Sequence, residues 1–284
     1  MRIGFVGLGV MGTAMSKRLL SLGYELVVWN RTISKAKPLE ELGAKVASSP
    51  VEVAEKSDYV HMAVADDHAS RAVVRPILKV RDKRVVVVNH STVTPMLSVE
   101  LYEEAREKGH AYLEVPVLGS WTEAEKGELL AMVGGDREVY EEVLPVLRGL
   151  SKEVVYVGEI GKASAFKLAV NLMLFNIALS LSESIALVES WGVDSQLLLD
   201  FMRKTWLKPV ADRYGERLRA EEYPLRFRLV LASKDLLYAV RAGHYKGQDI
   251  PLTSSSAQTY LAAARAGFGD KDYSRIYHYL KRKR

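Results

Sequence analysis

A glycine-rich turn near the start of the chain constrains the fold more than any other feature. Residues 7–12 read GLGVMG, directly after the apolar run RIGFV, and residues 13–22 have helical spacing. Glycines at these three positions permit a tight turn, a close approach of backbone to a pyrophosphate, and close packing of helix on strand. The helix N-terminus also offers free N–H groups to phosphates. The pattern therefore predicts a dinucleotide site formed by Gly7, Leu8, Gly9, Val10, Met11 and Gly12, with a plain turn containing incidental glycines as the alternative.

The end of the second predicted strand, YELVVWN at residues 24–30, bears on the choice of cofactor. An NAD-preferring site usually places Asp or Glu there, on the ribose diol. This chain has Asn30, Arg31 and Thr32 instead. Arg31 can pair with a 2′-phosphate, with Asn30 and Thr32 as further donors, so the sequence favours NADP, with NAD binding at lower affinity. The alternative is a surface arginine at a strand end.

Strand and helix signals alternate through residues 1–160. Strand-like runs at residues 59–64, 84–92 and 111–119 are separated by helical segments, which predicts parallel pairing through right-handed crossovers. After Gly161 helical runs follow one another, at residues 163–191, 195–205, 209–219, 231–243 and 251–266. We therefore expect an α/β, Rossmann-type doubly wound sheet over residues 1–160 that binds NADP. A long interdomain helix should join it to an all-helical domain over residues 161–284 for substrate binding and dimerisation.

Composition narrows the class of protein. The 284 residues include 48% hydrophobic and 26% charged residues and no cysteine, which indicates a globular chain, excludes thiolate sites and suits the cytoplasm. The net charge is +5, but Lys and Arg are scattered, so we expect no nucleic-acid partner. The basic end KRKR, residues 281–284, is expected to be a frayed terminus. No leader is expected, and the apolar stretch 168–181 falls short of the ~20 residues of a membrane span.

One polar pair interrupts the most apolar helical segment, SAFKLAVNLMLFNIAL at residues 164–179. Lys167 and Asn171 lie four positions apart and share a helix face. In one interpretation Lys167 snorkels to solvent and Asn171 is a hydrogen-bonded core amide. In the other, the pair belongs to an active site, because an apolar surrounding favours the neutral amine that an acid/base catalyst needs.

Several segments in order resemble the β-hydroxyacid dehydrogenase family, which includes 3-hydroxyisobutyrate dehydrogenase, tartronate semialdehyde reductase and glyoxylate/succinic semialdehyde reductases. They are residues 3–32, STVTP at 91–95, 114–135, GEIGKASAFKLAVNLML at 158–174, 227–239 and GFGDKDYS at 267–274. The resemblance covers essentially the whole chain. It implies an NAD(P)-dependent oxidoreductase that moves a hydride between nicotinamide and a small β-hydroxy acid of the 3-hydroxyisobutyrate, 3-hydroxypropionate or L-serine kind, giving the semialdehyde. A family alternative is glyoxylate/succinic semialdehyde reduction.

The same resemblance assigns roles to individual residues. Lys167 is implied as the general acid/base, and Asn171 as its neighbour on the substrate. Further cofactor contacts are implied at Val64, Ala65, Thr92 and Lys234, and substrate contacts at Ser91, Leu118, Gly119, Ser120, Lys167, Asn171, Phe227 and Asp235. Leu118 departs from the serine that relatives usually carry. Without the resemblance, Thr92 would be a strand-end or capping hydroxyl and Lys234 and Asp235 a solvated pair.

Residues outside the family motifs receive weaker interpretations. Trp206 and Arg213 are candidates for shaping the pocket, although core packing is the default for Trp206 and surface solvation for Arg213. His61, His68 and His90 have no metal-binding spacing and receive no role. Decarboxylation of 6-phosphogluconate, imine reduction and a non-catalytic NADP-binding regulator are the competing functions. We expect a small hydroxy-acid or semialdehyde substrate, no membrane partner and a homodimer or homotetramer.

Overall fold

The computed structural model describes residues 1–281, and of the basic end KRKR only Lys281 lies among them. The chain divides into two compact units, residues 1–167 and a second that starts at Leu168. Helix α8 (Lys162–Ser190) continues through this division. The domain boundary predicted after residue 160 and the roles predicted for the two domains stay predictions, so each unit is described by itself.

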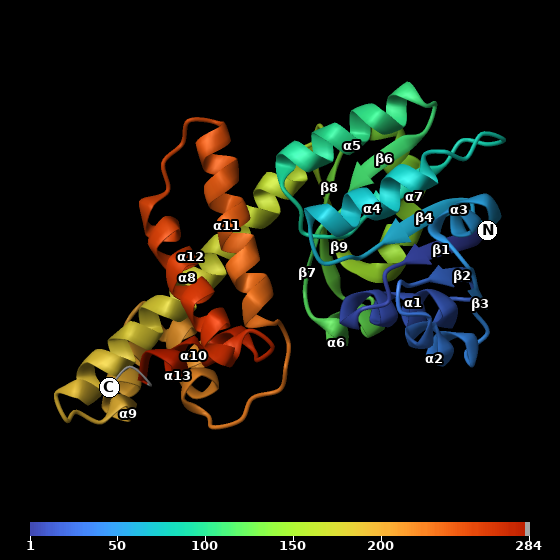
Figure 1. Ribbon diagram of the computed structural model, residues 1–284. Coiled ribbons are helices and arrows are strands. Elements are labelled where there is room, and N and C mark those ends of the chain that lie inside the picture. Colours follow the sequence, from blue (N-terminus) through green and yellow to red (C-terminus); the bar gives the residue numbers. More distant parts are fainter. Residues whose placement is uncertain (282–284) are drawn as a thin grey trace. The chain divides into compact units, whose positions relative to one another are not determined.

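The first unit is built on one nine-stranded sheet (Figure 1). The strands are β1 (Arg2–Val6), β2 (Glu25–Trp29), β3 (Lys45–Val46), β4 (Tyr59–Met62), β5 (Val86–Asn89), β6 (Ala111–Glu114), β7 (Val117–Leu118), β8 (Leu129–Gly134) and β9 (Ser151–Gly158). Their order is β3-β2-β1-β4-β5-β6-β8-β7, with β9 also paired to β8. The first six strands pair in parallel, as expected for a doubly wound sheet, and only the pairs β6–β8 and β7–β8 are antiparallel.

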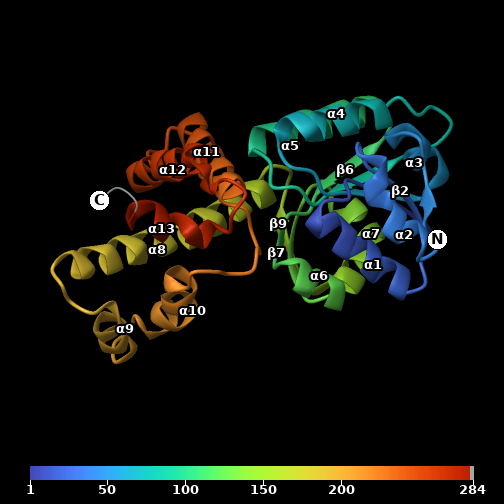
Figure 2. The same cartoon turned by 60° about the horizontal axis from the view of Figure 1, so that its bottom comes forward.

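Helices cover both faces of this sheet (Figure 2). They are α1 (Val10–Ser21), the 3₁₀ turn Ile33–Ala36, α2 (Lys37–Glu40), α3 (Pro50–Lys56), α4 (Asp67–Ile77), α5 (Pro95–Glu107), α6 (Trp121–Lys126) and α7 (Arg137–Leu150). One core joins the sheet to α3, α4 and α5, and two others join its opposite face to α1, α6 and α7. The helices start where the sequence supplies caps, as Ser49 does for α3 and Thr94 for α5.

The sequence predicted a single strand over residues 111–119, and this prediction was wrong. The run divides into β6 and β7, with Pro116 between them. Proline has no N–H to continue a ladder, and the Pro116 carbonyl instead accepts from the backbone N–H of Met132 at 3.0 Å. This break turns the chain away from the parallel strands and starts the antiparallel part of the sheet.

The second unit is helical. After α8 come α9 (Ser195–Arg203), α10 (Lys208–Arg219), α11 (Leu229–Tyr245), α12 (Pro251–Ala263), the π turn Ala264–Phe268, the 3₁₀ turn Tyr273–Arg275 and α13 (Ile276–Lys281). The predicted helical runs are therefore present, with ends shifted by up to three residues. All of these helices contribute apolar side chains to one core, among them Phe175 of α8 and Tyr260 of α12.

Helix α8 is longer than its central apolar stretch suggested. It has 29 residues, and an 18-residue window has a mean hydropathy of 1.6, so by length and composition it could cross a membrane. The expectation concerned the apolar stretch 168–181, and it is the longer helix around this stretch that meets the test of length and composition. A core helix passes the same test, and α8 supplies Phe175, Ala178 and Ile185 to the helical core.

Candidate active site

The glycine turn between β1 and α1 has the geometry that its sequence predicted. Gly7 has a φ of +92°, and a Cβ atom there would lie 2.4 Å from the carbonyl oxygen of Ala63. A Cβ atom on Gly12 would lie 1.9 Å from the carbonyl oxygen of Gly7. At Gly9, by contrast, a Cβ atom would meet nothing within 4 Å. Packing thus requires Gly7 and Gly12, whereas the space beside Gly9 is open to a ligand.

The first turn of α1 is suited to hold an anion. Gly9 is its N-cap and provides no side-chain cap, and no acidic residue lies in the first turn. Val10, the first helical residue, is 55% exposed. The uncapped N–H groups and the positive end of the helix dipole therefore fit the pyrophosphate of a dinucleotide.

A cavity of about 390 Å³ opens beside this turn. Its lining residues are Leu8, Gly9, Val10, Thr13, Ala14, Lys17, Lys35, Trp121 and Glu125. Sequence reasoning missed Lys35 and Trp121. The signal for Lys35 was present, because it is a cation in the turn that directly follows the second strand. Of the two lysines that line this cavity, Lys17 is engaged in a 2.9 Å ion pair with Glu125. Lys35 is therefore the lysine of the lining that is left to attract a phosphate beside the open turn.

The three residues after β2 differ in how the structure uses them. The Asn30 side chain fastens the turn, since its Oδ1 accepts from the backbone N–H of Leu8 and its Nδ2 donates to the carbonyl of Thr32, both at 2.9 Å. Arg31 is exposed and makes no hydrogen bond or ion pair with any residue in the described range 1–281. Arg31 and the Thr32 hydroxyl, which makes no capping hydrogen bond, are therefore the members of this group with donors to offer a ligand.

The carboxyl ends of β4 and β5 are held next to each other. The backbone N–H of Val64 donates to the hydroxyl of Ser91 at 2.8 Å, and the N–H of Ser91 donates to Oδ1 of Asn89 at 2.9 Å. The predicted residues Val64, Ala65, Ser91 and Thr92 thus meet at one edge of the sheet, the edge that also carries the glycine turn.

The predicted substrate loop is tied together from within. Leu118 is half-buried in β7, and Gly119 has a φ of +139°. Ser120 begins α6 with a capping box, in which its N–H and its hydroxyl both donate to Oε2 of Glu123, at 2.7 and 2.5 Å. The Ser120 hydroxyl is the main reason that the pKa of Glu123 falls to about 2. The two donors that Ser120 offered to a substrate carboxylate are thus engaged with a carboxylate of the protein itself.

Helix α8 is anchored at its first turn by a buried acid that the sequence analysis did not single out. Glu114, at the end of β6, is 1% exposed. Its Oε1 accepts from the N–H of Ala163 at 2.8 Å, and its Oε2 accepts from the hydroxyl of Ser164. Burial raises the pKa of Glu114. One turn further along α8, Lys167 is only 5% exposed, so the snorkelling interpretation is wrong.

Asn171 is engaged with predicted residues of the helical unit. Its Nδ2 donates to Oδ2 of Asp235 at 2.7 Å, and the Lys234 ammonium lies 3.1 Å from Oδ1 of the same carboxylate. Asp235 is 1% exposed, so the interpretation of residues 234 and 235 as a solvated pair is wrong for the acid. The Phe227 ring packs on Phe175, with centroids 5.6 Å apart.

Other predictions meet different outcomes. Trp206 is 86% exposed, so core packing was wrong for it, and Arg213 is exposed with its guanidinium over the Tyr214 ring. His61 and His90 form a buried pair, with Nδ1 of His61 2.8 Å from Nε2 of His90. Sequence analysis missed this pair because its members are 29 residues apart and meet only across β4 and β5. No group of His, Asp and Glu side chains that could hold a metal ion occurs in residues 1–281.

Comparison with known proteins decides the family. Residues 2–158 match the family described as the NAD binding domain of 6-phosphogluconate dehydrogenase, and residues 161–280 match that described as the NAD-binding domain of NADP-dependent 3-hydroxyisobutyrate dehydrogenase. Glyoxylate/succinic semialdehyde reductase 1 of Arabidopsis thaliana is 33% identical over 285 residues, 99% of each protein. The chain belongs to the β-hydroxyacid dehydrogenase family.

Solved structures agree with this membership. The Mycobacterium tuberculosis 3-hydroxyisobutyrate dehydrogenase, solved with L-serine, is 25% identical, has a TM-score of 0.88 and shares 99% of each chain. The protein Psf3, solved with NADP⁺ and 2-OPP, is 28% identical with a TM-score of 0.81, over 98% of this chain and 99% of that one. The chain is thus an NAD(P)-dependent hydroxyacid dehydrogenase, and the predicted fold class and cofactor type are confirmed.

Proposed function

We propose that this dehydrogenase transfers a hydride between NADP and a small β-hydroxy acid, with Lys167 as the general acid/base and Asn171 beside it on the substrate. The observation that carries this proposal is the burial of Lys167 one turn after the Glu114 anchor of α8. Burying an ammonium group is costly in free energy, and a catalytic role for Lys167 would explain why a lysine is kept at this buried position of the helix.

Proton transfer is the step that the protein itself must provide. When bound, the nicotinamide accepts or returns the hydride. In the oxidation, the neutral amine of Lys167 takes the hydroxyl proton as the carbonyl forms, and in the reduction its ammonium returns that proton. Asn171 lies four residues on and shares the helix face, so its amide is placed to orient the same substrate.

The proposed preference for NADP rests on Arg31 and Lys35. No carboxylate follows β2, and the Arg31 guanidinium has no competing acid within the described residues. Lys35 lines the cavity beside the glycine turn. Two cations at this place favour the additional phosphate of NADP over the bare ribose diol of NAD.

Reduction of a short semialdehyde is a second candidate for the physiological direction. It is favoured by the Arabidopsis relative, which is named a glyoxylate/succinic semialdehyde reductase. It is also compatible with Leu118, because an apolar side chain in the loop would replace the hydroxyl that other members offer the substrate. The L-serine present with the mycobacterial neighbour supports the hydroxy-acid alternative.

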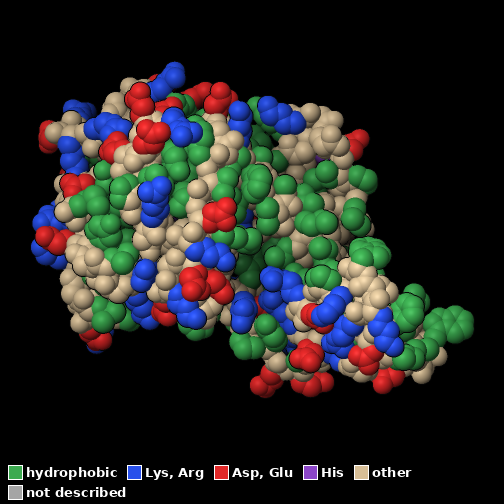
Figure 3. Space-filling model, turned by 180° about the vertical axis from the view of Figure 1, so that it is seen from behind, with side chains coloured by type: hydrophobic (Ala, Val, Ile, Leu, Met, Phe, Trp, Pro, Cys, Tyr) green, Lys and Arg blue, Asp and Glu red, His purple; other side chains and the backbone are tan. Residues whose placement is uncertain are grey.

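We also propose that the enzyme works as a homodimer or homotetramer, in the cytoplasm. Large apolar side chains are exposed at the end of α8, on α9 and in the turn after it, namely Leu187, Trp191, Leu197, Phe201 and Trp206, which are 60 to 86% exposed. Figure 3 shows apolar side chains gathered at the tip of the helical unit. A contiguous apolar surface of this kind supports association between copies of the chain. The absence of cysteine supports a reducing compartment.

The experiment that tests the function compares Lys167→Ala with Lys162→Ala on the same helix. Lys162 is exposed and pairs with Glu159, so it provides a matched loss of one lysine. Initial rates are measured with NADP and NAD for the alcohols 3-hydroxyisobutyrate, 3-hydroxypropionate and L-serine, and with NADPH and NADH for the carbonyl compounds glyoxylate and succinic semialdehyde. Lys167→Ala should lose about 10²- to 10⁴-fold in kcat while still binding NADP, and Lys162→Ala should match the parent. Equal rates for both variants would remove Lys167 from the mechanism.

A further inference from the structure

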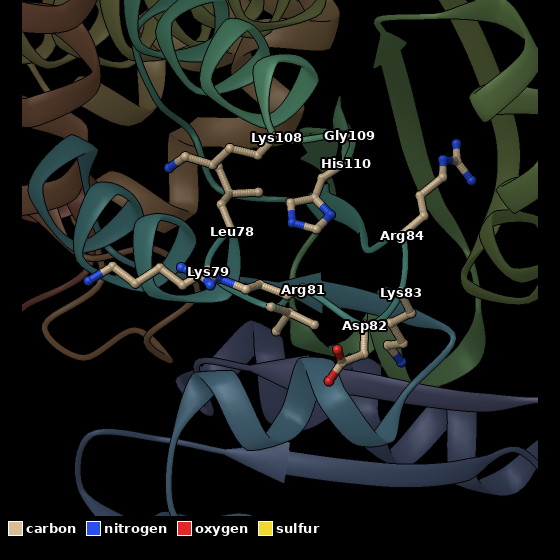
Figure 4. Close-up of a pocket in the computed structure, with 10 residues that line it drawn as sticks. Leu78, Lys79, Arg81, Asp82, Lys83, Arg84, Lys108, Gly109 and His110 are labelled. Atoms are coloured by element: carbon tan, nitrogen blue, oxygen red, sulfur yellow. The ribbon is translucent and has the colours of Figure 1, made fainter.

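A second cavity lies at the opposite edge of the sheet from the glycine turn. It has a volume of about 650 Å³ and is lined by Leu78, Lys79, Val80, Arg81, Asp82, Lys83, Arg84, Lys108, Gly109 and His110. These residues come from the two loops that lead into β5 and β6 (Figure 4). The cavity is therefore at the amino ends of parallel strands, whereas the coenzyme turn follows the carboxyl end of β1, so the two sites are distinct within the same unit.

The cavity is strongly basic, and part of its charge is uncommitted. Lys83 donates to the carbonyl of Ser57, and Arg84 pairs with Glu142 at 3.0 Å. Lys79, Arg81 and Lys108 are exposed, and their side chains make no hydrogen bond or ion pair within the part of the chain that the structure describes. In Figure 4 these three side chains extend to the same side of the view, and Asp82, the one acid, extends away from them. Three unpaired cations in a lining that contains a single acid attract a multivalent anion.

His110 adds a buried donor to the lining of the cavity. The residue is 8% exposed, and its Nδ1 accepts from the backbone N–H of Val85 at 3.2 Å. Because Nδ1 acts as the acceptor, the hydrogen of the neutral ring is on Nε2. Nε2 is buried and has no partner among the described residues. A buried donor without an acceptor is unfavourable, and an oxygen of a bound ligand would satisfy it.

We propose that this cavity binds a small molecule carrying a diphosphate group, such as a nucleoside diphosphate, at a site separate from the coenzyme. Three cations on two loops and one ring N–H call for several acceptor oxygens that face different ways, which a diphosphate has and a planar carboxylate lacks. The volume exceeds the need of a phosphate ion and lies in the range of small-molecule pockets. Leu78 and Val80 supply an apolar floor for an organic group.

The test is calorimetric titration of the whole enzyme, held saturated with NADP⁺, with inorganic pyrophosphate and with ADP. The double variant Lys79→Gln/Lys108→Gln is compared with Lys45→Gln/Lys152→Gln, which loses the same charge from exposed positions outside the cavity. We expect one site per chain in the parent, tighter for ADP, weakened at least about tenfold in the cavity variant and less than about twofold in the control.

Four results would overturn the proposal. The first is the absence of pyrophosphate binding when NADP⁺ is saturating, and the second is displacement of pyrophosphate by NADP⁺, which would assign it to the coenzyme site. The third is an equal loss of affinity in the two double variants, which would show that binding depends on the net charge of the protein and not on the cavity. The fourth is a failure of ADP to bind where pyrophosphate does, which would leave the apolar floor without a ligand. None of these results depends on Lys167 or on the substrate of the dehydrogenase.

Discussion

Asn171 donates from its side-chain amide to the carboxylate of Asp235, with 2.7 Å between Nδ2 and Oδ2. Both residues are nearly fully buried, and Lys234 is the cation next to the same carboxylate. This contact fixes the orientation of the Asn171 amide on the face of α8 that also carries Lys167. A hydrogen bond to a buried charge is strong, so the amide is held with little freedom.

We expect Asn171→Ala to reduce kcat and stability together. The change removes a hydrogen-bond donor from the buried Asp235 carboxylate, and we expect this loss to lower the free energy of unfolding by about 1–3 kcal/mol. The control is Asn176→Ala, which removes a second buried amide of α8 that donates to Thr253 at 3.1 Å. If Asn171 serves the substrate, the two variants lose similar stability by urea unfolding, but only Asn171→Ala raises KM for the hydroxy acid and lowers kcat. A parallel loss of activity in both would assign Asn171 a structural role.

Two of the three glycines of the turn, Gly9 and Gly12, should respond differently to substitution by alanine. At Gly9 the φ is −74° and the new methyl group meets no atom, so Gly9→Ala should keep the parent's melting temperature. The methyl group would instead fill the space of the phosphates and lower NADP affinity at least about tenfold. At Gly12 the methyl group would collide with the Gly7 carbonyl, and we expect about 1–3 kcal/mol of lost stability. Fluorescence titration with NADPH and thermal unfolding separate the two effects, and unaltered NADPH affinity in Gly9→Ala would contradict the assignment.

Arg31 should decide between the two nicotinamide cofactors. Removing its guanidinium in Arg31→Ala should raise KM for NADP at least about tenfold, because a charge-assisted contact with a phosphate is lost, and should leave KM for NAD nearly unchanged. Arg137→Ala is a suitable control, since Arg137 is an exposed arginine of α7 that pairs with Glu141 at 3.0 Å. The ratio of kcat/KM values for the two cofactors is the measurement. An unchanged ratio would place the NADP preference elsewhere, with Lys35 as the next candidate.

The His61–His90 pair should make stability depend on pH. Burial lowers the pKa of both rings, that of His90 to about 4, so the folded state binds fewer protons than the unfolded chain. The stabilisation is present above the unfolded pKa of about 6.5 and is lost as the pH falls toward 4, by about 3 kcal/mol for His90 alone. His61→Phe keeps an aromatic ring beside Phe5 but removes one titrating group. Urea unfolding between pH 4 and 7 should give a shallower slope for the variant, and equal slopes would refute the linkage.

The coenzyme turn could be predicted from sequence because its determinants are local. A strand, three glycines and a helix fall within residues 2–22, and the steric needs of Gly7 and Gly12 follow from that order alone. The run of helices after Gly161 was equally accessible, because each has its own apolar periodicity. The fold class thus followed from patterns that short segments carry by themselves.

Contacts between distant segments could not be predicted in the same way. Glu114 and Ala163 are separated by 49 positions, and no spacing rule connects an acid at a strand end with the first turn of a later helix. The hydrogen bonds between Ser120 and Glu123 are local, and the sequence spacing is that of a capping box. The family resemblance instead assigned Ser120 to the substrate. The exposure of Trp206 was missed because burial is only a tendency of tryptophan, which a single sequence position does not have to follow.

Glu114 should act on catalysis through the start of α8. In Glu114→Gln one of the two acceptor oxygens becomes an NH2 donor, so the hydrogen bonds from Ala163 to Oε1 and from Ser164 to Oε2 cannot both be kept in their present positions. The first turn of the helix, one turn before Lys167, should shift, and a shift on the order of 1 Å lowers kcat about a hundredfold. Because the pKa of Glu114 is raised in the folded state, the free energy of unfolding should also depend on pH. The folded state of the parent holds this proton more tightly than the unfolded chain, so the parent loses stability as the pH rises from about 4.5 through the folded pKa, and Glu114→Gln lacks that loss.

Two variants calibrate the effect of Glu114→Gln. Ser164→Ala removes the hydroxyl that donates to Oε2 of Glu114, and Ser182→Ala removes a buried hydroxyl of α8 that donates to the carbonyl of Ala178 in the same helix. The expected order of kcat loss is Glu114→Gln, then Ser164→Ala, then Ser182→Ala with almost none, at unchanged NADPH affinity. A shift in the pH profile of kcat should accompany the first two, because the amine of Lys167 would titrate in an altered position. If Glu114→Gln lowers the melting temperature but keeps both kcat and its pH profile, Glu114 supports the fold without positioning Lys167.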